Sequence, residues 1–163
     1  MSLIVENGTI VLGANTYVSD ADYQDYATAR GYVIGATAVL REIELTKAVD
    51  YLESMRDRYK GTKVQRDQPL QFPRVSLFID GYQTDSNTIP EELKKAQMEL
   101  AFLSIGFNLS PSGTFQNVQS QQLGTLSVSY FNGGSYNSVQ LNSVKQFLNA
   151  LLKNSYGNTA VRA

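Results

Sequence analysis

The sequence lacks cysteine, histidine and tryptophan. Without cysteine the chain can form no disulfide, no thiolate nucleophile and no zinc–thiolate site. Without histidine it lacks the commonest general base and the commonest ligand of transition metals. These absences exclude zinc hydrolases and the enzymes whose nucleophile is activated by histidine. Chemistry that uses carboxylates, lysine or tyrosine stays open.

Charge is also scarce, at 18% of the residues against about 25% in an average soluble domain. No charged residue lies between Glu99 and Lys145. A soluble domain rarely leaves so long a segment without charge, so we expect a partner to cover it. No apolar run approaches the roughly 18 residues of a membrane-spanning helix, and the first residues have neither the basic nor the apolar region of a signal peptide.

The chain nevertheless contains enough apolar sequence for a core. Hydrophobic residues make up 42% of its 163 residues, and ten tyrosines and seven phenylalanines supply large side chains. This length fits one domain that buries a core of its own. We expect a single domain over residues 1–153 and a polar C-terminal tail over residues 154–163.

The charges fall in blocks. Residues 1–55 hold three basic and eight acidic side chains, whereas residues 56–74 hold six basic and two acidic ones. This basic segment could follow a phosphate backbone, with Tyr59 and Phe72 as stacking platforms for single-stranded bases. Alternatively, it is a partner-facing segment that neutralises acids elsewhere, such as those in the first third of a neighbouring copy. The net charge of −1 favours the second interpretation, because autonomous nucleic-acid binders are usually basic.

Apolar residues spaced three and four apart predict helices. Two such stripes, Leu45, Ala48, Leu52, Met55 and Tyr59 in the second helix and Leu93, Ala96, Leu100, Leu103 and Phe107 in the third, predict that these two helices pack together as the core. Ser19 is the expected N-cap of a helix that stops at Gly31, and Pro90 is the expected first residue of another. Gly61 is expected just beyond the end of the longest helix. The predicted helices cover residues 19–30, 37–59, 90–108 and 138–153. The predicted fold class is therefore mainly α, a small bundle of about four helices with a minor β element.

Two β elements are predicted in the first half of the chain. Asn7-Gly8, between the β-branched runs of residues 3–5 and 9–12, predicts an N-terminal hairpin. The long connection over residues 62–88 is kept extended by its prolines, and it contains a short strand over 75–79 before a turn at Asp80-Gly81. Connections of this length are usually functional or packed against a partner.

A third β element follows in the uncharged part of the chain. Residues 123–130 alternate as a strand that places Leu126, Val128 and Tyr130 on one face, ahead of a turn at Gly133-Gly134. The apolar face can lie on the subunit, but the backbone edge needs a partner strand. We expect a neighbouring copy to supply that strand; the alternative is pairing with the N-terminal hairpin of the same chain.

No motif for catalysis or cofactor binding is present. The sequence has no glycine-rich phosphate loop and no calcium-binding loop. The paired carboxylates of Asp20 and Asp22, and of Glu91 and Glu92, lie where helix N-termini are expected, so capping explains them. We therefore expect no enzymatic activity, no cofactor and no metal.

One string in the long connection is distinctive: Gln68-Pro69-Leu70-Gln71-Phe72-Pro73-Arg74, with the Ile89-Pro90 helix start after it. Together with Ala14–Ser19, Tyr59-Lys60-Gly61 and Ala96–Ala101, it resembles the head–tail connector, or head-completion, proteins of tailed bacteriophages. The similarity is greatest to the branch labelled DnaT-like single-stranded-DNA-binding protein, and it is best over residues 1–105.

The resemblance implies a non-catalytic virion protein of the phage neck, assembled in the host cytoplasm. It implies a homo-oligomeric ring, typically of about twelve copies, that lies below the portal protein and docks the next neck or tail protein. Double-stranded DNA would pass through the channel without sequence-specific binding, and no membrane is involved. The label of the branch keeps a second function open, that of a single-stranded-DNA-binding accessory protein. A helical interaction module is a third.

Two groups of candidate residues follow. The motif group is expected to be structural: Gly61, Gln68, Pro69, Leu70, Phe72, Pro73, Arg74 and Pro90. The second group is expected at a subunit or portal interface: Arg56, Arg58, Lys60, Lys63, Arg66, Leu126, Val128, Tyr130, Gly133 and Gly134. Within the motif, Leu70 and Phe72 point to the same side of an extended string, so we predict that Phe72 is buried against the subunit's own helices.

Overall fold

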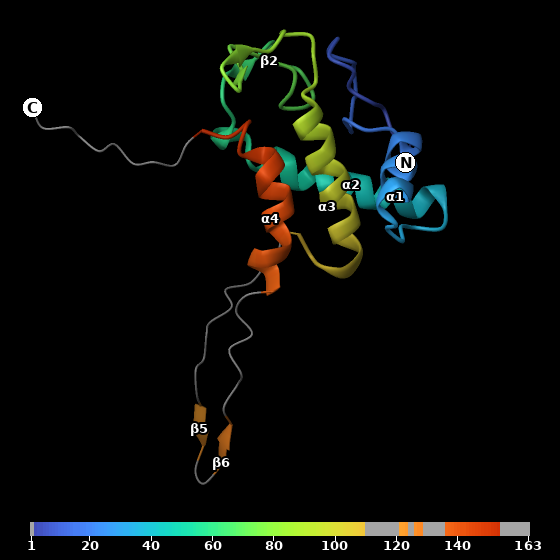
Figure 1. The fold of residues 1–163 in the computed structure, drawn as a ribbon, viewed down its shortest axis with the longest axis vertical. Helices are drawn as coiled ribbons and strands as arrows, with labels where there is room; N and C mark the ends of the chain where they lie inside the picture. Colours follow the sequence, from blue (N-terminus) through green and yellow to red (C-terminus); the bar gives the residue numbers. More distant parts are fainter. Residues whose placement is uncertain (1, 110–120, 124–125, 129–135, 154–163) are drawn as a thin grey trace, which may run out of the picture.

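The computed structural model describes residues 2–109, 121–123, 126–128 and 136–153. This part of the chain is mainly α-helical with small antiparallel strand pairs, as the sequence predicts (Figure 1). The predicted tail over 154–163 lies outside it. The helices of the described part are α1 (Asp20–Arg30), α2 (Ala38–Ser54), α3 (Glu91–Gly106) and α4 (Tyr136–Leu148). A 3₁₀ turn, η1 (Arg56–Arg58), follows α2. None of the described helices is long and apolar enough to cross a membrane.

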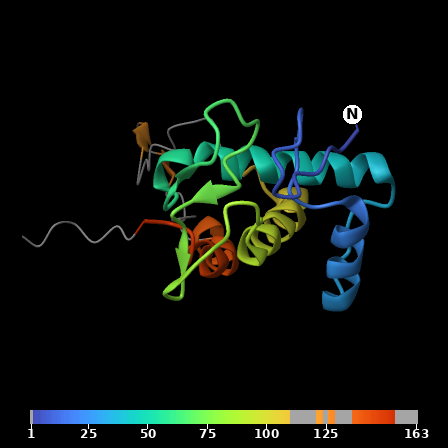
Figure 2. The same cartoon turned by 90° about the horizontal axis from the view of Figure 1, so that it is seen from above.

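The strands form short pairs. They are β1 (Thr62–Lys63) with β2 (Arg74–Val75), β3 (Phe78–Ile79) with β4 (Tyr82–Gln83), and β5 (Gln121–Leu123) with β6 (Leu126–Val128). The predicted strand over 75–79 is divided between β2 and β3, and the predicted turn at Asp80-Gly81 joins β3 to β4 with both residues at positive φ. α1 lies at the N-terminal end of α2, whereas β1–β4 lie toward its C-terminal end (Figure 2).

The core lies between α2 and α3, and α4 packs against α3. Leu45 and Leu52 from α2 and Leu93 and Leu100 from α3 are completely buried, and Leu148 of α4 joins them. These residues belong to the predicted apolar stripes, so the prediction that the second and third helices form the core is confirmed.

Capping residues set three of the helix boundaries. The side chain of Ser19 accepts a hydrogen bond from the N–H of Asp22, and Gly31 ends α1 in the left-handed region. The side chain of Thr37 accepts from the first turn of α2. Pro90 is the N-cap of α3 and not its first helical residue, so α3 begins at Glu91, one residue later than predicted.

α2 is shorter than its predicted range. It ends at Ser54, and the chain passes through η1 into extended backbone at Tyr59. The Tyr59 hydroxyl returns to the helix and donates to the carbonyl oxygen of Leu52 at 3.0 Å. Because Met55 and Tyr59 stay buried after the helix has ended, the apolar periodicity continues past the true boundary. Gly61 is therefore not a helix cap.

The N-terminal hairpin predicted around Asn7-Gly8 is wrong. The buried carboxylate of Glu6 accepts three backbone N–H groups from residues 8–11, at 2.8–2.9 Å. These amides are therefore not available for a strand ladder. Gly8 has a φ of 103°, and a side chain there would collide with the carbonyl oxygen of Asn87. Gly8 thus allows close contact with the backbone of Asn87, and Asn7-Gly8 does not form a two-residue turn between strands.

The single strand predicted over residues 123–130 is also wrong. β5 and β6 pair antiparallel within the chain, with Leu123 opposite Leu126 and Gln122 opposite Ser127. Only two residues of the sequence separate the paired leucines. The alternative pairing with an N-terminal hairpin is wrong too, since β6 pairs with β5. Figure 1 shows this pair apart from the four helices.

Candidate interaction surfaces

The motif Gln68–Arg74 forms an internal brace. The amide of the buried Gln68 side chain donates to the carbonyl oxygens of Leu70 at 2.9 Å and of Pro73 at 3.0 Å, and it accepts from the N–H of Gln65 at 3.0 Å. One side chain therefore fixes the curvature of the whole string. Leu70 and Pro73 are buried, whereas Pro69 is exposed.

Phe72 is the buried anchor of this string, as predicted, with 1% of its side chain exposed. Its ring meets those of Tyr17 and Tyr59 edge to face, with centroids 6.2 and 5.0 Å away. Such aromatic pairs stabilise a core beyond the area that they bury. The motif thus belongs to the subunit's own core.

A half-buried acid, Glu53, links the motif to α2. The Tyr17 hydroxyl donates to the carboxylate of Glu53 at 2.6 Å, and the N–H of Gln71 donates to the same oxygen at 3.1 Å. Burial raises the pKa of Glu53, and burial together with the nearby Glu53 carboxylate raises the pKa of Tyr17. No local signal in the sequence indicates this cluster, because its members come from three distant segments.

Arg74 ties the motif to the segment after η1. Its guanidinium donates to the carbonyl oxygens of Lys60 and Gly61, both at 2.8 Å, and to that of Gln71 at 3.3 Å. The residue is buried, and burial lowers its pKa. Arg74 therefore acts as a structural cation that binds backbone oxygens, not as a surface charge.

Gly61 allows the backbone contact between β1 and β2. It has a φ of 67°, and a side chain there would collide with the carbonyl oxygen of Val75 in β2. Gly81 has a similar φ of 86° in the β3–β4 turn, but no atom lies within 4 Å of the position of a Cβ. Substitutions at the two glycines therefore distinguish two costs. A side chain at Gly81 meets only an unfavourable φ, whereas a side chain at Gly61 meets an unfavourable φ and a clash.

We expect Gly61→Ala to destabilise the protein by at least twice as much as Gly81→Ala. The Gly81 variant should lose about 1–2 kcal/mol, the strain of a left-handed residue. The Gly61 variant must in addition separate two hydrogen-bonded strands. Urea denaturation followed by circular dichroism measures both, and equal losses would contradict the packing role given to Gly61.

The basic segment over 56–74 is partly used inside the subunit. The ammonium group of Lys60 donates to the carbonyl oxygen of Ala150, and that of Lys63 to Gln68, both at 2.8 Å. Arg74 is buried, as described above. Exposed cations of this segment are Arg56, Arg58 and Arg66, of which Arg56 lies 3.9 Å from Asp57.

The proposed stacking platforms are inaccessible. Tyr59 and Phe72 are each only 1% exposed, so the interpretation that they stack on single-stranded bases is wrong. Among the described residues, the aromatic side chains that are well exposed are Phe78 and Tyr82 of the β3–β4 hairpin and Phe107 after α3.

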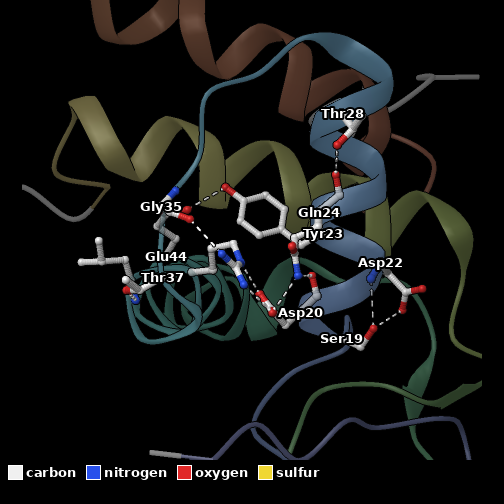
Figure 3. Close-up of polar contacts among 11 residues, drawn as sticks. Ser19, Asp20, Asp22, Tyr23, Gln24, Thr28, Gly35, Thr37 and Glu44 are labelled. Carbon is white, nitrogen blue, oxygen red and sulfur yellow. Dashed lines mark hydrogen bonds and ion pairs between the residues drawn. The ribbon is translucent and has the colours of Figure 1, made fainter.

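Charged and polar contacts fix the corner between α1 and α2 (Figure 3). The guanidinium of Arg41 donates to both oxygens of Asp20, at 2.6 and 2.8 Å, and this contact lowers the pKa of Asp20. The buried carboxylate of Glu44 accepts from the Tyr23 hydroxyl at 2.9 Å and from the N–H of Gly35 at 3.0 Å. The connection between the two helices is therefore attached to α2.

The connection after α1 and the first turns of α2 also carry exposed aliphatic side chains, a set here called the apolar corner. It consists of Val33, Val39, Leu40 and Ile43, with exposed fractions from 45 to 85%. Of the other predicted interface residues, Leu126 and Val128 lie in β6, whereas Tyr130, Gly133 and Gly134 lie outside the described residues.

A shallow depression also opens at the end of α3, beside Lys47 and Asp50 of α2, and its volume is about 520 Å³. Its lining combines the apolar residues Ile105, Phe107 and Leu109 with the polar residues Lys47, Asp50, Ser104 and Asn108. In the described ranges, no group of three or more acidic side chains could hold a metal ion.

One comparison with known proteins gives a match. The model of a family described as "Putative DnaT-like ssDNA binding protein" matches residues 1–163. No curated protein and no solved structure matches the chain. The family match includes both the motif Gln68–Arg74 and the uncharged stretch between Glu99 and Lys145.

Proposed function

The chain belongs to the family described as "Putative DnaT-like ssDNA binding protein", and we propose that it is a structural subunit of a tailed-phage head–tail connector. In this role copies form a ring below the portal protein, extend the DNA channel and dock the next neck or tail protein. The subunit is non-catalytic and uses no cofactor. It assembles in the host cytoplasm and remains in the virion neck.

One observation carries the proposal: several side chains that could bind DNA are instead buried or hydrogen-bonded within the subunit. A site for single strands combines a cationic groove with exposed aromatic platforms. In the basic segment, Lys60, Lys63 and Arg74 donate to carbonyl oxygens of the same chain. Tyr59 and Phe72 are buried in the same region. The segment therefore uses these three cations and both rings inside the subunit.

The remaining surface favours contact with protein. The apolar corner groups four exposed aliphatic side chains, and such surfaces usually mark protein–protein contacts. The absence of charge over residues 100–144 is consistent with coverage by a neighbour, because interface cores are depleted of charge. A channel through which duplex DNA slides also favours a neutral or acidic lining, and residues 1–55 carry an acidic excess.

The family description favours a second candidate, a single-stranded-DNA-binding accessory protein. Arg56, Arg58 and Arg66 are exposed and could contact phosphates. Fluorescence anisotropy with a labelled single-stranded oligonucleotide at rising salt separates the two functions. Steeply salt-dependent binding that is lost when these three arginines become glutamine supports the accessory role. Absence of binding, with ring density below the portal in electron micrographs of phage necks, supports the connector.

We further propose that the β5–β6 pair contributes to assembly, and we expect Ser127→Pro to prevent ring formation on the portal. A two-stranded pair is marginally stable alone, and its outer edges can accept a strand from a neighbouring copy. Proline removes the N–H of Ser127 and distorts the pairing with Gln122. Because the pair lies apart from the helices, the helical body should remain folded.

Ser127→Ala is the matched control, since it retains the backbone N–H and should assemble normally. Co-assembly with portal rings followed by negative-stain electron microscopy measures ring formation, and circular dichroism reports the helical body. Assembly of the proline variant would refute the role of this pair. Unfolding of its helices would place the pair in the core instead.

A further inference from the structure

Residues 7–13 form a loop whose two ends are fixed to each other. The N–H of Glu6 donates to the carbonyl oxygen of Thr16 at 2.8 Å, and the N–H of Asn15 donates to that of Ile4 at 2.9 Å. Most of the residues between these bonds are exposed or half-buried. The loop can therefore open without separating the two segments that carry it.

One carboxylate, that of Glu6, keeps this loop in its folded shape. Its Oε1 accepts from the N–H groups of Gly8 at 2.8 Å and Ile10 at 2.9 Å, and its Oε2 accepts from that of Val11 at 2.8 Å. The side chain is 1% exposed. Ile10 has a φ of 61°, which is unfavourable for a β-branched residue. The loop would therefore relax to another shape if the carboxylate were lost.

The loop also contains a chemically labile dipeptide, Asn7-Gly8. In such a pair the backbone nitrogen of the second residue attacks the side-chain carbonyl carbon of the first, and glycine hinders this attack least. A bond forms between the Gly8 nitrogen and Asn7 Cγ, the Cγ–Nδ2 bond breaks, and the proton of the Gly8 N–H leaves with Nδ2 as ammonia. Water then opens the cyclic imide at either carbonyl, which gives aspartate or isoaspartate.

The folded loop restrains both reacting groups. The Gly8 N–H is bound to Glu6, whose negative charge disfavours the anionic nitrogen that makes the attack. The Asn7 carbonyl oxygen accepts from the N–H of Thr9 at 3.1 Å and from its hydroxyl at 2.7 Å. These two bonds fix the side chain but also polarise the carbonyl. The protection of Asn7 therefore depends on the Gly8 nitrogen, and hence on Glu6.

We propose that Asn7 is a latent self-modification site, which is protected while Glu6 binds the backbone amides of the loop and is converted to aspartate or isoaspartate when the loop opens. Gly8 has a φ of 103°, and a side chain there would collide with the carbonyl oxygen of Asn87. The fold therefore requires the glycine that makes Asn7 labile, and the Glu6 carboxylate compensates for it. This inference does not depend on the connector function.

Conversion to isoaspartate makes the opening irreversible. The backbone then passes through the former side chain, and it is longer by one carbon atom between residue 7 and Gly8. The N–H groups of Gly8 and Ile10 share one oxygen of Glu6 in the folded loop. In the longer backbone they no longer reach that oxygen together. A transient opening thus becomes a permanent loss of the folded loop.

The rate of Asn7 conversion, measured by peptide mapping and mass spectrometry in a mildly alkaline buffer, tests the protection. The folded chain should convert Asn7 roughly tenfold or more slowly than the chain unfolded in guanidinium chloride, because only the open loop reacts. Asn132-Gly133, the same dipeptide outside the described residues, is the internal reference. Both asparagines should convert at similar rates in the unfolded chain. Equal rates for Asn7 in the folded and unfolded chains would overturn the proposal.

Glu6→Gln tests the residue that protects the site. The amide retains the size of the side chain but replaces one acceptor oxygen with a donor, so it cannot bind all three N–H groups. The folded variant should convert Asn7 roughly tenfold faster than the unchanged chain. Glu91→Gln removes an exposed carboxylate and is the control, with no expected change in rate. Equal rates for Glu6→Gln and the unchanged chain would refute the role of Glu6.

A denaturant series tests the same point if Glu6→Gln does not fold. In the unchanged chain, conversion of Asn7 should accelerate at guanidinium chloride concentrations below the midpoint of helix unfolding measured by circular dichroism, because the loop opens first. Acceleration that begins only as the helices unfold would contradict local opening.

The converted protein tests irreversibility. After separation by ion exchange, it should keep its helical circular dichroism but exchange the amide hydrogens of residues 8–11 roughly tenfold faster or more. Unchanged protection of these amides would show that the loop closes again after conversion.

Discussion

Phe72→Ala should lower the free energy of unfolding by about 3–5 kcal/mol, the usual cost of truncating a fully buried phenylalanine. The side chain is 1% exposed and lies between Tyr17 and Tyr59. Neither ring can move into the space, because the Tyr17 hydroxyl is held by Glu53 and that of Tyr59 by the Leu52 carbonyl. The variant should therefore keep a cavity.

The measurement is urea denaturation of the purified subunit, followed by far-ultraviolet circular dichroism. Phe107→Ala is the control, since this phenylalanine is 40% exposed and its loss should cost under about 1 kcal/mol. Phe72→Leu should fall between the two, because it retains apolar volume but loses the edge-to-face contacts. Equal midpoints for Phe72→Ala and Phe107→Ala would refute the anchoring role.

The parts of the fold that the sequence predicts correctly depend on local physics. Ser19, Gly31 and Thr37 act within a few residues of their own positions, and the structure confirms them as helix boundaries. The apolar stripes of α2 and α3 repeat at the helical period, so their packing was predictable as well. The burial of Phe72 followed from the alternation of side chains in an extended string.

The incorrect predictions concern residues whose partners are distant in the chain. Gly8 packs against Asn87, so the Asn-Gly signal has a tertiary cause that no local pattern contains. Tyr59 was predicted inside a helix because its burial continues the apolar period, although its backbone is extended. The spacing of apolar residues indicates which side chains are buried, but it does not indicate where the helical hydrogen bonds end.

The candidate surfaces were less predictable than the core for a related reason. Composition locates the basic segment, but only the structure separates Lys60, Lys63 and Arg74, which bind carbonyl oxygens, from exposed Arg58 and Arg66. The sequence does not indicate that the residues of the apolar corner are exposed. Val33 lies in the expected connection and the other three lie in the expected helix, where aliphatic residues are equally common in a buried position. Exposure depends on what the rest of the chain leaves uncovered.

Arg74→Ala should have the second largest effect, a loss of about 2–4 kcal/mol in the free energy of unfolding. Removal of the guanidinium leaves the carbonyl oxygens of Lys60, Gly61 and Gln71 without their donor. Each partly buried acceptor left unpaired costs about 1–3 kcal/mol, reduced where water can reach it. The variant should also weaken the β1–β2 pairing, because Arg74 belongs to β2 and holds the backbone just before β1.

Arg74→Lys distinguishes hydrogen-bond geometry from charge. An ammonium group retains the positive charge, but it cannot match the planar fork that reaches Lys60 and Gly61 together. We therefore expect lysine to recover less than half of the loss seen with alanine, in the same denaturation assay. Arg66→Ala, at an exposed position of the same segment, should change stability by under about 0.5 kcal/mol. Full recovery by lysine would show that position 74 requires only a positive charge, and the motif would then be open to the phosphate-binding role that its geometry argues against.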